Sequence, residues 1–205
     1  MLHYTMTENE IKNEIDREYQ FLIEKANYRW QRFANEIKKE NKSSFPICKQ
    51  TEIVTTNNNK GYLVFVAQYR MYNLDISATA YFIMRNAVGR ATLVEVTFNT
   101  KEVGTITTYS AHFFDRYVER LGLSVKGVSA IEHFITHYLR GTHYQNDGKV
   151  FESYPFGIGL GVYNDNKRIM YINTFVSKDL LFKEQKNLIN LINQHRQSLA
   201  IKTIL

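Results

Sequence analysis

The start of the chain carries apolar side chains with the period of a helix. Thr7 and Glu10 have the spacing of a capping box, in which each side chain accepts a hydrogen bond from a backbone N–H of the first turn. Apolar positions then follow at intervals of three or four residues: Ile11, Ile15, Tyr19, Leu22, Ala26, Trp30, Phe33 and Ile37. One face is therefore apolar, and the pattern predicts a long helix from about Thr7 to Asn41.

Two uses of this first element stay open. Residues 1–43 can pack on the rest of the chain as an appendage, or they can form a homodimer through the apolar face. Helical periodicity serves both arrangements equally well. We interpret the remainder, residues 44–205, as a single domain, since its length is typical of one.

Beyond a polar loop at residues 55–61, the apolar period changes to that of strands. The pattern predicts strands at 61–71, 78–85, 90–98 and 103–108, and short connections predict that they pair antiparallel. Both alternating sets of positions in the first strand begin apolar. We therefore expect that strand to lie inside the sheet, covered on both faces.

The chain then returns to helices and again to strands. Expected helices run from Ser110 to Leu121, before Gly122, and from Ser129 to Gly141; expected strands are 149–154, 156–163 and 168–176; a final helix is expected from Ser177. The sequence thus predicts an α+β fold. Its parts are a mostly antiparallel sheet, a long N-terminal helix, a central helix pair and a C-terminal helix.

The composition restricts the cellular compartment and the partners that we expect, but it does not indicate a function. Cys48 is the only cysteine, so no disulfide can form within the chain, which favours a reducing compartment. The first residues lack the basic and apolar regions of a signal peptide, and no apolar run approaches the roughly 18 residues of a membrane span. We expect a cytoplasmic protein without a membrane partner. Its net charge of +6 permits an anionic partner such as nucleic acid.

The most suggestive chemistry lies on the first central helix. His112, Arg116 and Arg120 are spaced by four and form one ridge. An imidazole can move a proton near neutral pH, and guanidinium groups can hold a phosphate and stabilise its added charge. Asp115 and Glu119 share the helix, so the arginines can alternatively form solvated ion pairs.

Further candidates follow in the second half of the chain. In the strand 168–176, Tyr171 or Thr174 can donate a hydrogen bond to a phosphate, and we add Arg168 and Arg140 as nucleic-acid contacts. Before that strand, alternate glycines 157, 159 and 161 leave a strip of bare backbone. Such a strip most often admits a packed helix and less often a ligand.

Two histidines of the second central helix have a spacing found in metal sites. His133 and His137 are spaced by four, which suits chelation on a helix. The zinc-protease pattern needs Glu directly after the first histidine, and Phe134 stands there instead. No third ligand is evident, so we predict no metal and no other cofactor.

The order of these features resembles that of small bacterial toxin-type ribonucleases. Ser110-Ala111-His112, then Arg116, then Glu119-Arg120, and a later hairpin ending Ile172-Asn173-Thr174-Phe175 look like the pattern of the BrnT and RelE proteins. The resemblance covers about Thr105 to Ser177. It implies a metal-independent ribonuclease or an RNA-binding relative. His112 would act as acid or base, Arg116 and Arg120 would bind phosphate, and Thr174 would lie near the scissile bond.

We therefore predict a nucleic-acid-acting protein, with endoribonuclease activity at a His/Arg site as the leading hypothesis. The alternative is a non-enzymatic phage or mobile-element accessory protein that binds a protein or nucleic-acid partner as a dimer. In that case the long helix would dimerise, and a sheet rich in the 14 Tyr and 13 Phe would hold the partner. A metal hydrolase built on His133 and His137 is the third hypothesis.

Overall fold

One sheet forms the centre of the molecule. A computed structural model describes residues 1–70, 73–98, 103–137, 142–182 and 186–187. The strands are β1 (Ile47–Val54), β2 (Lys60–Arg70), β3 (Asn73–Arg85), β4 (Ala91–Phe98), β5 (Val103–Tyr109), β6 (Thr142–Asn146), β7 (Lys149–Tyr154), β8 (Gly157–Asn164) and β9 (Ile169–Ser177). Their order in the sheet is β1-β2-β3-β4-β5-β9-β8-β7-β6. β5 and β9 pair parallel, and every other neighbouring pair is antiparallel.

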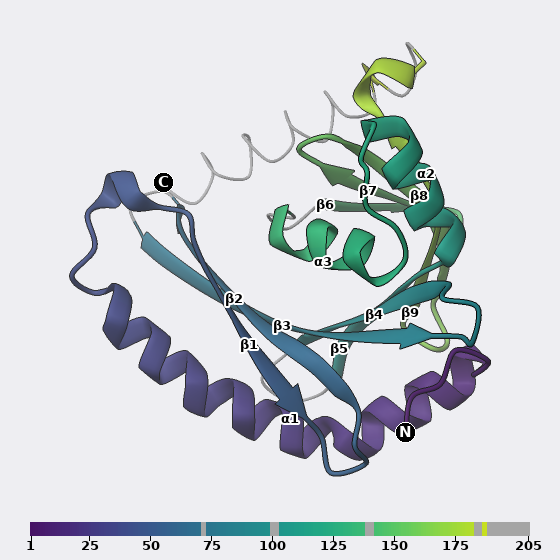
Figure 1. Ribbon diagram of the computed structural model, residues 1–205. Helices are drawn as coiled ribbons and strands as arrows, with labels where there is room; N and C mark the ends of the chain where they lie inside the picture. The colour runs from purple at the N-terminus through teal and green to yellow at the C-terminus, as the bar shows by residue number, and fades with distance from the viewer. Residues whose placement is uncertain (71–72, 99–102, 138–141, 183–185, 188–205) are drawn as a thin grey trace.

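Helices cover both faces of this sheet. α1 (Glu8–Ile37) lies along one face, and α2 (Ala111–Leu121) and α3 (Val128–His137) lie on the other (Figure 1). Strand β2 shows why both faces are apolar. Its side chains Leu63 and Phe65 belong to the core beneath α1, whereas Val64 and Val66 belong to the core beneath α2 and α3. The expectation of a strand covered on both faces is confirmed for β2.

The α+β class and the mostly antiparallel sheet agree with the sequence analysis, but the predicted arrangement of helices was wrong. The central pair is not set between two groups of strands; it covers one face of a single sheet that the later strands rejoin through β9. A helix does not begin at Ser177, since β9 runs to that residue and a short 3-10 turn (Lys178–Leu180) follows. Most of the predicted C-terminal helix lies outside the described residues.

The error at Ser177 has a local cause. Serine before a run with apolar residues is typical of a helix start, but here the Ser177 side chain makes no capping hydrogen bond. Its backbone is instead engaged in the sheet opposite Gly157. The two outermost strands, β1 and β6, were not predicted from the sequence. Outer strands pair on one side only, so their apolar alternation is weak.

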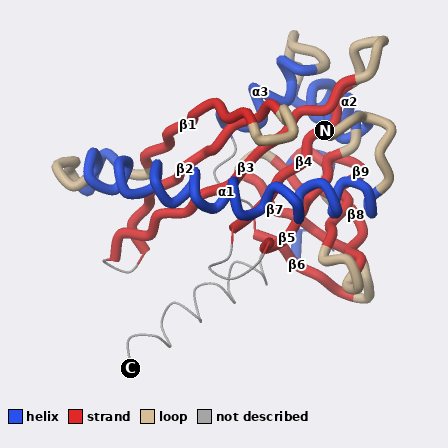
Figure 2. The backbone as a smooth tube through the Cα atoms, turned by 90° about the horizontal axis from the view of Figure 1, so that it is seen from below, coloured by secondary structure: helices blue, strands red, loops and turns tan. Residues whose placement is uncertain are grey.

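The long first helix forms as predicted at its start and ends earlier than expected. Thr7 and Glu10 make the capping box. The helix ends at Ile37, and Trp30, expected on its apolar face, is 40% exposed. α1 runs across the strands of the sheet (Figure 2), and its buried apolar residues join one core with the sheet. The face considered for dimerisation is therefore covered within the chain, and a homodimer through α1 stays a prediction.

Two buried carboxylates attach α1 to the loop between β1 and β2. Glu18 accepts hydrogen bonds from the backbone N–H of Asn57 at 2.6 Å and from the Thr56 hydroxyl at 2.6 Å. Glu14 accepts from the side-chain amides of Asn57 at 3.2 Å and Asn59 at 3.0 Å, and pairs with the amino group of Met1. Burial raises the pKa of Glu14, but these partners outweigh it and leave the pKa lowered.

Candidate functional site

Helix α2 carries the His/Arg motif, and both of its ends are capped. The Ser110 hydroxyl accepts a hydrogen bond from the Phe113 backbone N–H at 3.1 Å. Gly122 ends the helix in the left-handed conformation, with φ at 62°. Phe113 and Tyr117 are fully buried against the sheet and turn the polar residues outward. The predicted limits of this helix are confirmed.

The chain positions α2 by ending β5 early. β5 pairs with β9 only as far as Tyr109 and Ile172. Beyond that point, Ser110 and α2 donate hydrogen bonds to the carbonyl groups of β9 that β5 no longer reaches. The backbone N–H of Ser110 donates to the Ile172 carbonyl at 3.0 Å, the Ser110 hydroxyl donates to the Asn173 carbonyl at 2.9 Å, and the Arg120 guanidinium donates to the Phe175 carbonyl. These contacts join the two segments that the sequence analysis singled out.

A bulge in β9 adds a feature beside the start of α2. Leu160 of β8 pairs with Thr174 and Gly161 pairs with Ile172, so Asn173 has no partner in β8 and its side chain is exposed. The close approach of the two strands explains Gly161. A Cβ at that position would lie 2.1 Å from the Tyr171 carbonyl oxygen. This glycine therefore faces a neighbouring strand rather than a helix or ligand.

The three side chains of the motif differ in their interaction partners. We name this set, His112, Arg116 and Arg120, the α2 ridge. His112 is exposed and makes no hydrogen bond within the described part of the chain. Arg116 forms an ion pair with Glu119 at 2.6 Å, and both side chains are largely exposed. Arg120 is held by the carbonyl of β9. The ion-pair alternative therefore applies to Arg116, at a spacing of three.

The structure does not bring Thr174 to the α2 ridge. Phe175 packs into the core beneath α2, with its ring centroid 5.9 Å from that of Phe113. Because side chains alternate along a strand, the Thr174 side chain projects from the opposite face. Arg140 lies outside the described residues. Asn173, rather than Thr174, is the exposed side chain of this segment, and its backbone carbonyl accepts the hydrogen bond from Ser110.

The other two predicted nucleic-acid contacts also lie elsewhere. Arg168 is exposed in the turn before β9, at the far end of that strand, where it lines a hollow with Asp16. Tyr171 is half-buried toward α1. Burial, followed by the neighbouring Tyr4 and Glu8, raises its pKa. The predicted set of site residues therefore divides between the two faces of the sheet.

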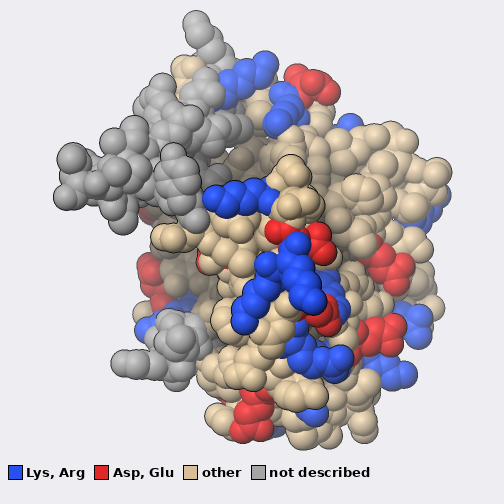
Figure 3. Space-filling view, turned by 90° about the vertical axis from the view of Figure 1, so that its left-hand side faces the viewer, with Lys and Arg blue, Asp and Glu red and all other residues tan. Residues whose placement is uncertain are grey.

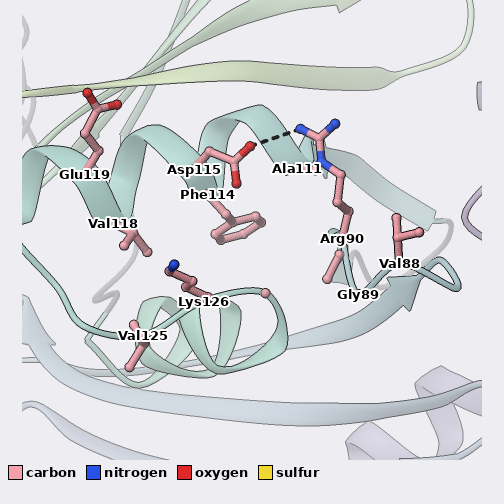
Figure 4. A pocket seen from close by; sticks show the side chains of 12 residues that line it. Val88, Gly89, Arg90, Ala111, Phe114, Asp115, Val118, Glu119, Val125 and Lys126 are labelled. Carbon is pink, nitrogen blue, oxygen red and sulfur yellow. Dashed lines mark hydrogen bonds and ion pairs between the residues drawn. The ribbon is translucent and has the colours of Figure 1, made fainter.

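A pocket lies on the opposite flank of α2 from β9. Its volume is about 400 Å³, and it is bounded by α2, the turn between β3 and β4, and the loop before α3 (Figure 4). The Phe114 ring lies inside, and Arg90 closes one end through a 3.0 Å ion pair with Asp115. Glu119 and Lys126 add one charge of each sign. Sequence periodicity could not find this pocket, because its walls come from three separate segments.

The Nδ1 atoms of His133 and His137 are both engaged by other groups of the protein. The two rings stack, with centroids 4.1 Å apart. The Nδ1 atom of His133 lies 2.8 Å from the Tyr117 hydroxyl, and that of His137 lies 2.8 Å from the His133 carbonyl oxygen. Burial and then the charge of His137 lower the pKa of His133. No cluster of three metal-ligating side chains occurs within the described ranges.

A second polar cluster lies in the core beneath α3. The Tyr109 hydroxyl is 2.7 Å from a carboxyl oxygen of Glu95 and 3.0 Å from one of Glu152, and Tyr154 donates to the same Glu152 oxygen at 2.8 Å. All four side chains are at most 4% exposed. This cluster was not predicted from the sequence. The available signal was Glu95, the one charged residue in an otherwise largely apolar strand.

Comparisons with family models, with curated proteins and with solved structures found no match for this chain. The resemblance to BrnT and RelE ribonucleases therefore stays a prediction. Among the described helices, none is both long enough and apolar enough to cross a membrane.

Proposed function

We propose that the protein is a ribonuclease that needs no metal ion and acts at the α2 ridge. The observation that carries the proposal is the exposed His112 imidazole. It makes no hydrogen bond within the described residues and shares one helix flank with two guanidinium groups. A proton carrier beside cations suits a phosphodiester, whose cleavage moves a proton and adds charge to phosphate oxygens.

Both Arg116 and Arg120 have N–H groups that can donate hydrogen bonds to a phosphate. The Arg116–Glu119 pair is solvent-exposed, and such pairs contribute only about 0–1 kcal/mol, so a phosphate can replace the carboxylate. Arg120 gives one N–H to the β9 carbonyl. A guanidinium has five N–H groups in a planar fork, and the rest stay available to donate.

The proposed reaction is a transfer within the RNA strand. His112 accepts the proton of a ribose 2′-hydroxyl, whose oxygen attacks the adjacent phosphorus. The bond from phosphorus to the 5′-oxygen breaks, and that oxygen takes a proton from water. The products are a 2′,3′-cyclic phosphate and a free 5′-hydroxyl. Arg116 and Arg120 offset the charge on the phosphate oxygens during this step.

The test compares wild type with His112→Ala on fluorescently labelled single-stranded RNA in excess EDTA. We expect RNA cleavage by wild type and a rate at least about 100-fold lower for the variant, since general acid–base groups contribute about that much or more. His3→Ala is the matched control, because His3 is an exposed histidine that is distant in the sequence from His112. It is expected to cleave at the wild-type rate.

DNA of the same sequence is the second control, since it lacks the 2′-hydroxyl and is expected to stay intact. Equal rates for His112→Ala and wild type would mean that His112 carries no proton in the reaction. Activity that disappears in EDTA would reject the metal-independent chemistry. Both variants are purified in parallel with wild type, so contaminating nuclease would appear in all three.

A further inference from the structure

A groove lies between α1 and the outermost strand β1, on the face of the sheet opposite α2. Its volume is about 270 Å³, and it is lined by Arg29, Arg32, Lys49, Thr51 and Phe65. None of these lining residues is acidic. The groove follows from the short connection after α1, which returns the chain along the C-terminal half of that helix as β1.

Cations continue from the groove along the same flank of α1. Lys25 and Arg32 are seven residues apart, which places them on one side of the helix about two turns from each other. Glu36, on the same side, is ion-paired with Lys49. Figure 3 shows Lys and Arg side chains gathered near the centre of the side that lies at the left of Figure 1, with a few acidic side chains among them.

Aromatic rings accompany the cations on α1 and on β2, two of the elements that form the groove. On α1, Tyr28 is 62% exposed, and the Lys25 ammonium lies 5.4 Å from the centre of the Phe21 ring. On β2, Tyr69 is 37% exposed, and the Lys42 ammonium lies 5.3 Å from its ring centre. Each of these two elements therefore carries an exposed tyrosine ring.

We infer that this surface, here named the α1–β1 groove, binds single-stranded nucleic acid. The cations contact the phosphates, and Tyr28 and Tyr69 stack on unpaired bases. Positively charged grooves that track a backbone, with rings for successive bases, are the general means of holding single strands without reading their sequence. A duplex hides its base faces, so the rings favour a single strand. The groove is independent of the α2 ridge, which lies on the other face of the sheet.

The experiment measures binding of a fluorescein-labelled oligo-dT strand by anisotropy, at several salt concentrations. DNA is used so that cleavage at the α2 ridge cannot interfere. Lys25→Glu/Arg32→Glu is expected to weaken binding at least tenfold at 50 mM salt. It is also expected to lower the slope of log K against log salt by about 1.4, because single strands contribute about 0.7 per phosphate contact.

Lys149→Glu/Lys178→Glu is the matched control, since both lysines are exposed and the net charge changes equally. We expect this control to bind within threefold of wild type. Tyr28→Ala is expected to weaken binding at least fivefold with an unchanged salt slope, since stacking of one base contributes about 1–3 kcal/mol.

Three results would overturn the inference. One is equal weakening by the groove variant and the control, which would indicate net charge alone. The second is tighter binding of duplex than of single strand. The third is binding of vesicles containing anionic lipid without binding of oligo-dT. His112→Ala is expected to bind like wild type, so a failure here leaves the ribonuclease proposal untouched, and the reverse also holds.

Discussion

The buried Glu95–Tyr109–Glu152 cluster makes a sharp prediction about stability. The Tyr109 hydroxyl carries one proton, so it can donate to one carboxyl oxygen at a time, although oxygens of both glutamates lie within 3.0 Å. The hydroxyl therefore lies between two carboxyl groups inside the core, all within hydrogen-bond distance.

Two substitutions distinguish the contribution of the hydroxyl to stability from that of the carboxyl groups. Tyr109→Phe keeps the ring contacts with Phe113 and Phe134, whose centroids are 5.3 and 5.4 Å away. It removes the hydrogen bond that the hydroxyl donates to a buried carboxyl group, while Tyr154 still donates to Glu152. At about 1.5–3 kcal/mol for a hydrogen bond to a charged group, we expect a loss of about 2 kcal/mol.

Glu95→Gln should behave differently, although it also changes the same cluster. The amide has the shape of the carboxyl group and can donate an N–H to the Tyr109 oxygen, while Tyr109 donates to Glu152. All three groups then have a partner with one fewer buried charge. We expect a change of less than about 1 kcal/mol in either direction.

The assay is equilibrium unfolding in urea at pH 7, followed by circular dichroism, for wild type and both variants. Equal values of the denaturant slope would show that the unfolding transitions are comparable. The reasoning would be refuted if Glu95→Gln destabilised the protein as much as Tyr109→Phe. It would also be refuted if Tyr109→Phe cost less than about 0.5 kcal/mol, because a buried hydrogen bond to a charged group is expected to contribute more.

Two further predictions concern α1 and the β8–β9 pairing. Because the pKa of Glu14 is lowered in the folded state, its contribution to stability is complete above its ordinary value of 4.5 and is lost as the pH falls through the lowered value. In urea unfolding between pH 7 and 3, Glu14→Gln should therefore flatten the acid side of the profile, and a profile identical to that of wild type would contradict this. Gly161→Ala should destabilise the fold by about 2 kcal/mol or more, because the new Cβ would meet the Tyr171 carbonyl oxygen. Gly89→Ala is its control, since no atom lies within 4 Å of that Cβ; its positive φ still costs about 1 kcal/mol, so equal losses would contradict the crowding argument.

Local signals determined the helices that have a clear apolar face and the strands inside the sheet. The Thr7–Glu10 capping box, the limits of α2 at Ser110 and Gly122, and the covered strand β2 were all predicted correctly from the sequence. In each case the signal lies within a few consecutive residues, where hydrogen bonds or alternation of side chains are formed. Trp30 and Ser177 show the limit, since the same local pattern also occurs where the surroundings decide otherwise.

What only the tertiary structure decided is how distant segments meet. The parallel pairing of β5 with β9 joins residues far apart in the chain, and that pairing places α2 along the edge of β9. The bulge at Asn173 turns Thr174 away from the α2 ridge. The pattern of apolar and polar residues in the sequence does not predict this bulge. The groove beside α1 and the shared contacts of Glu95 and Glu152 arise in the same way. Periodicity reports which face of an element is buried, but the partner of that face depends on the packing of the whole chain.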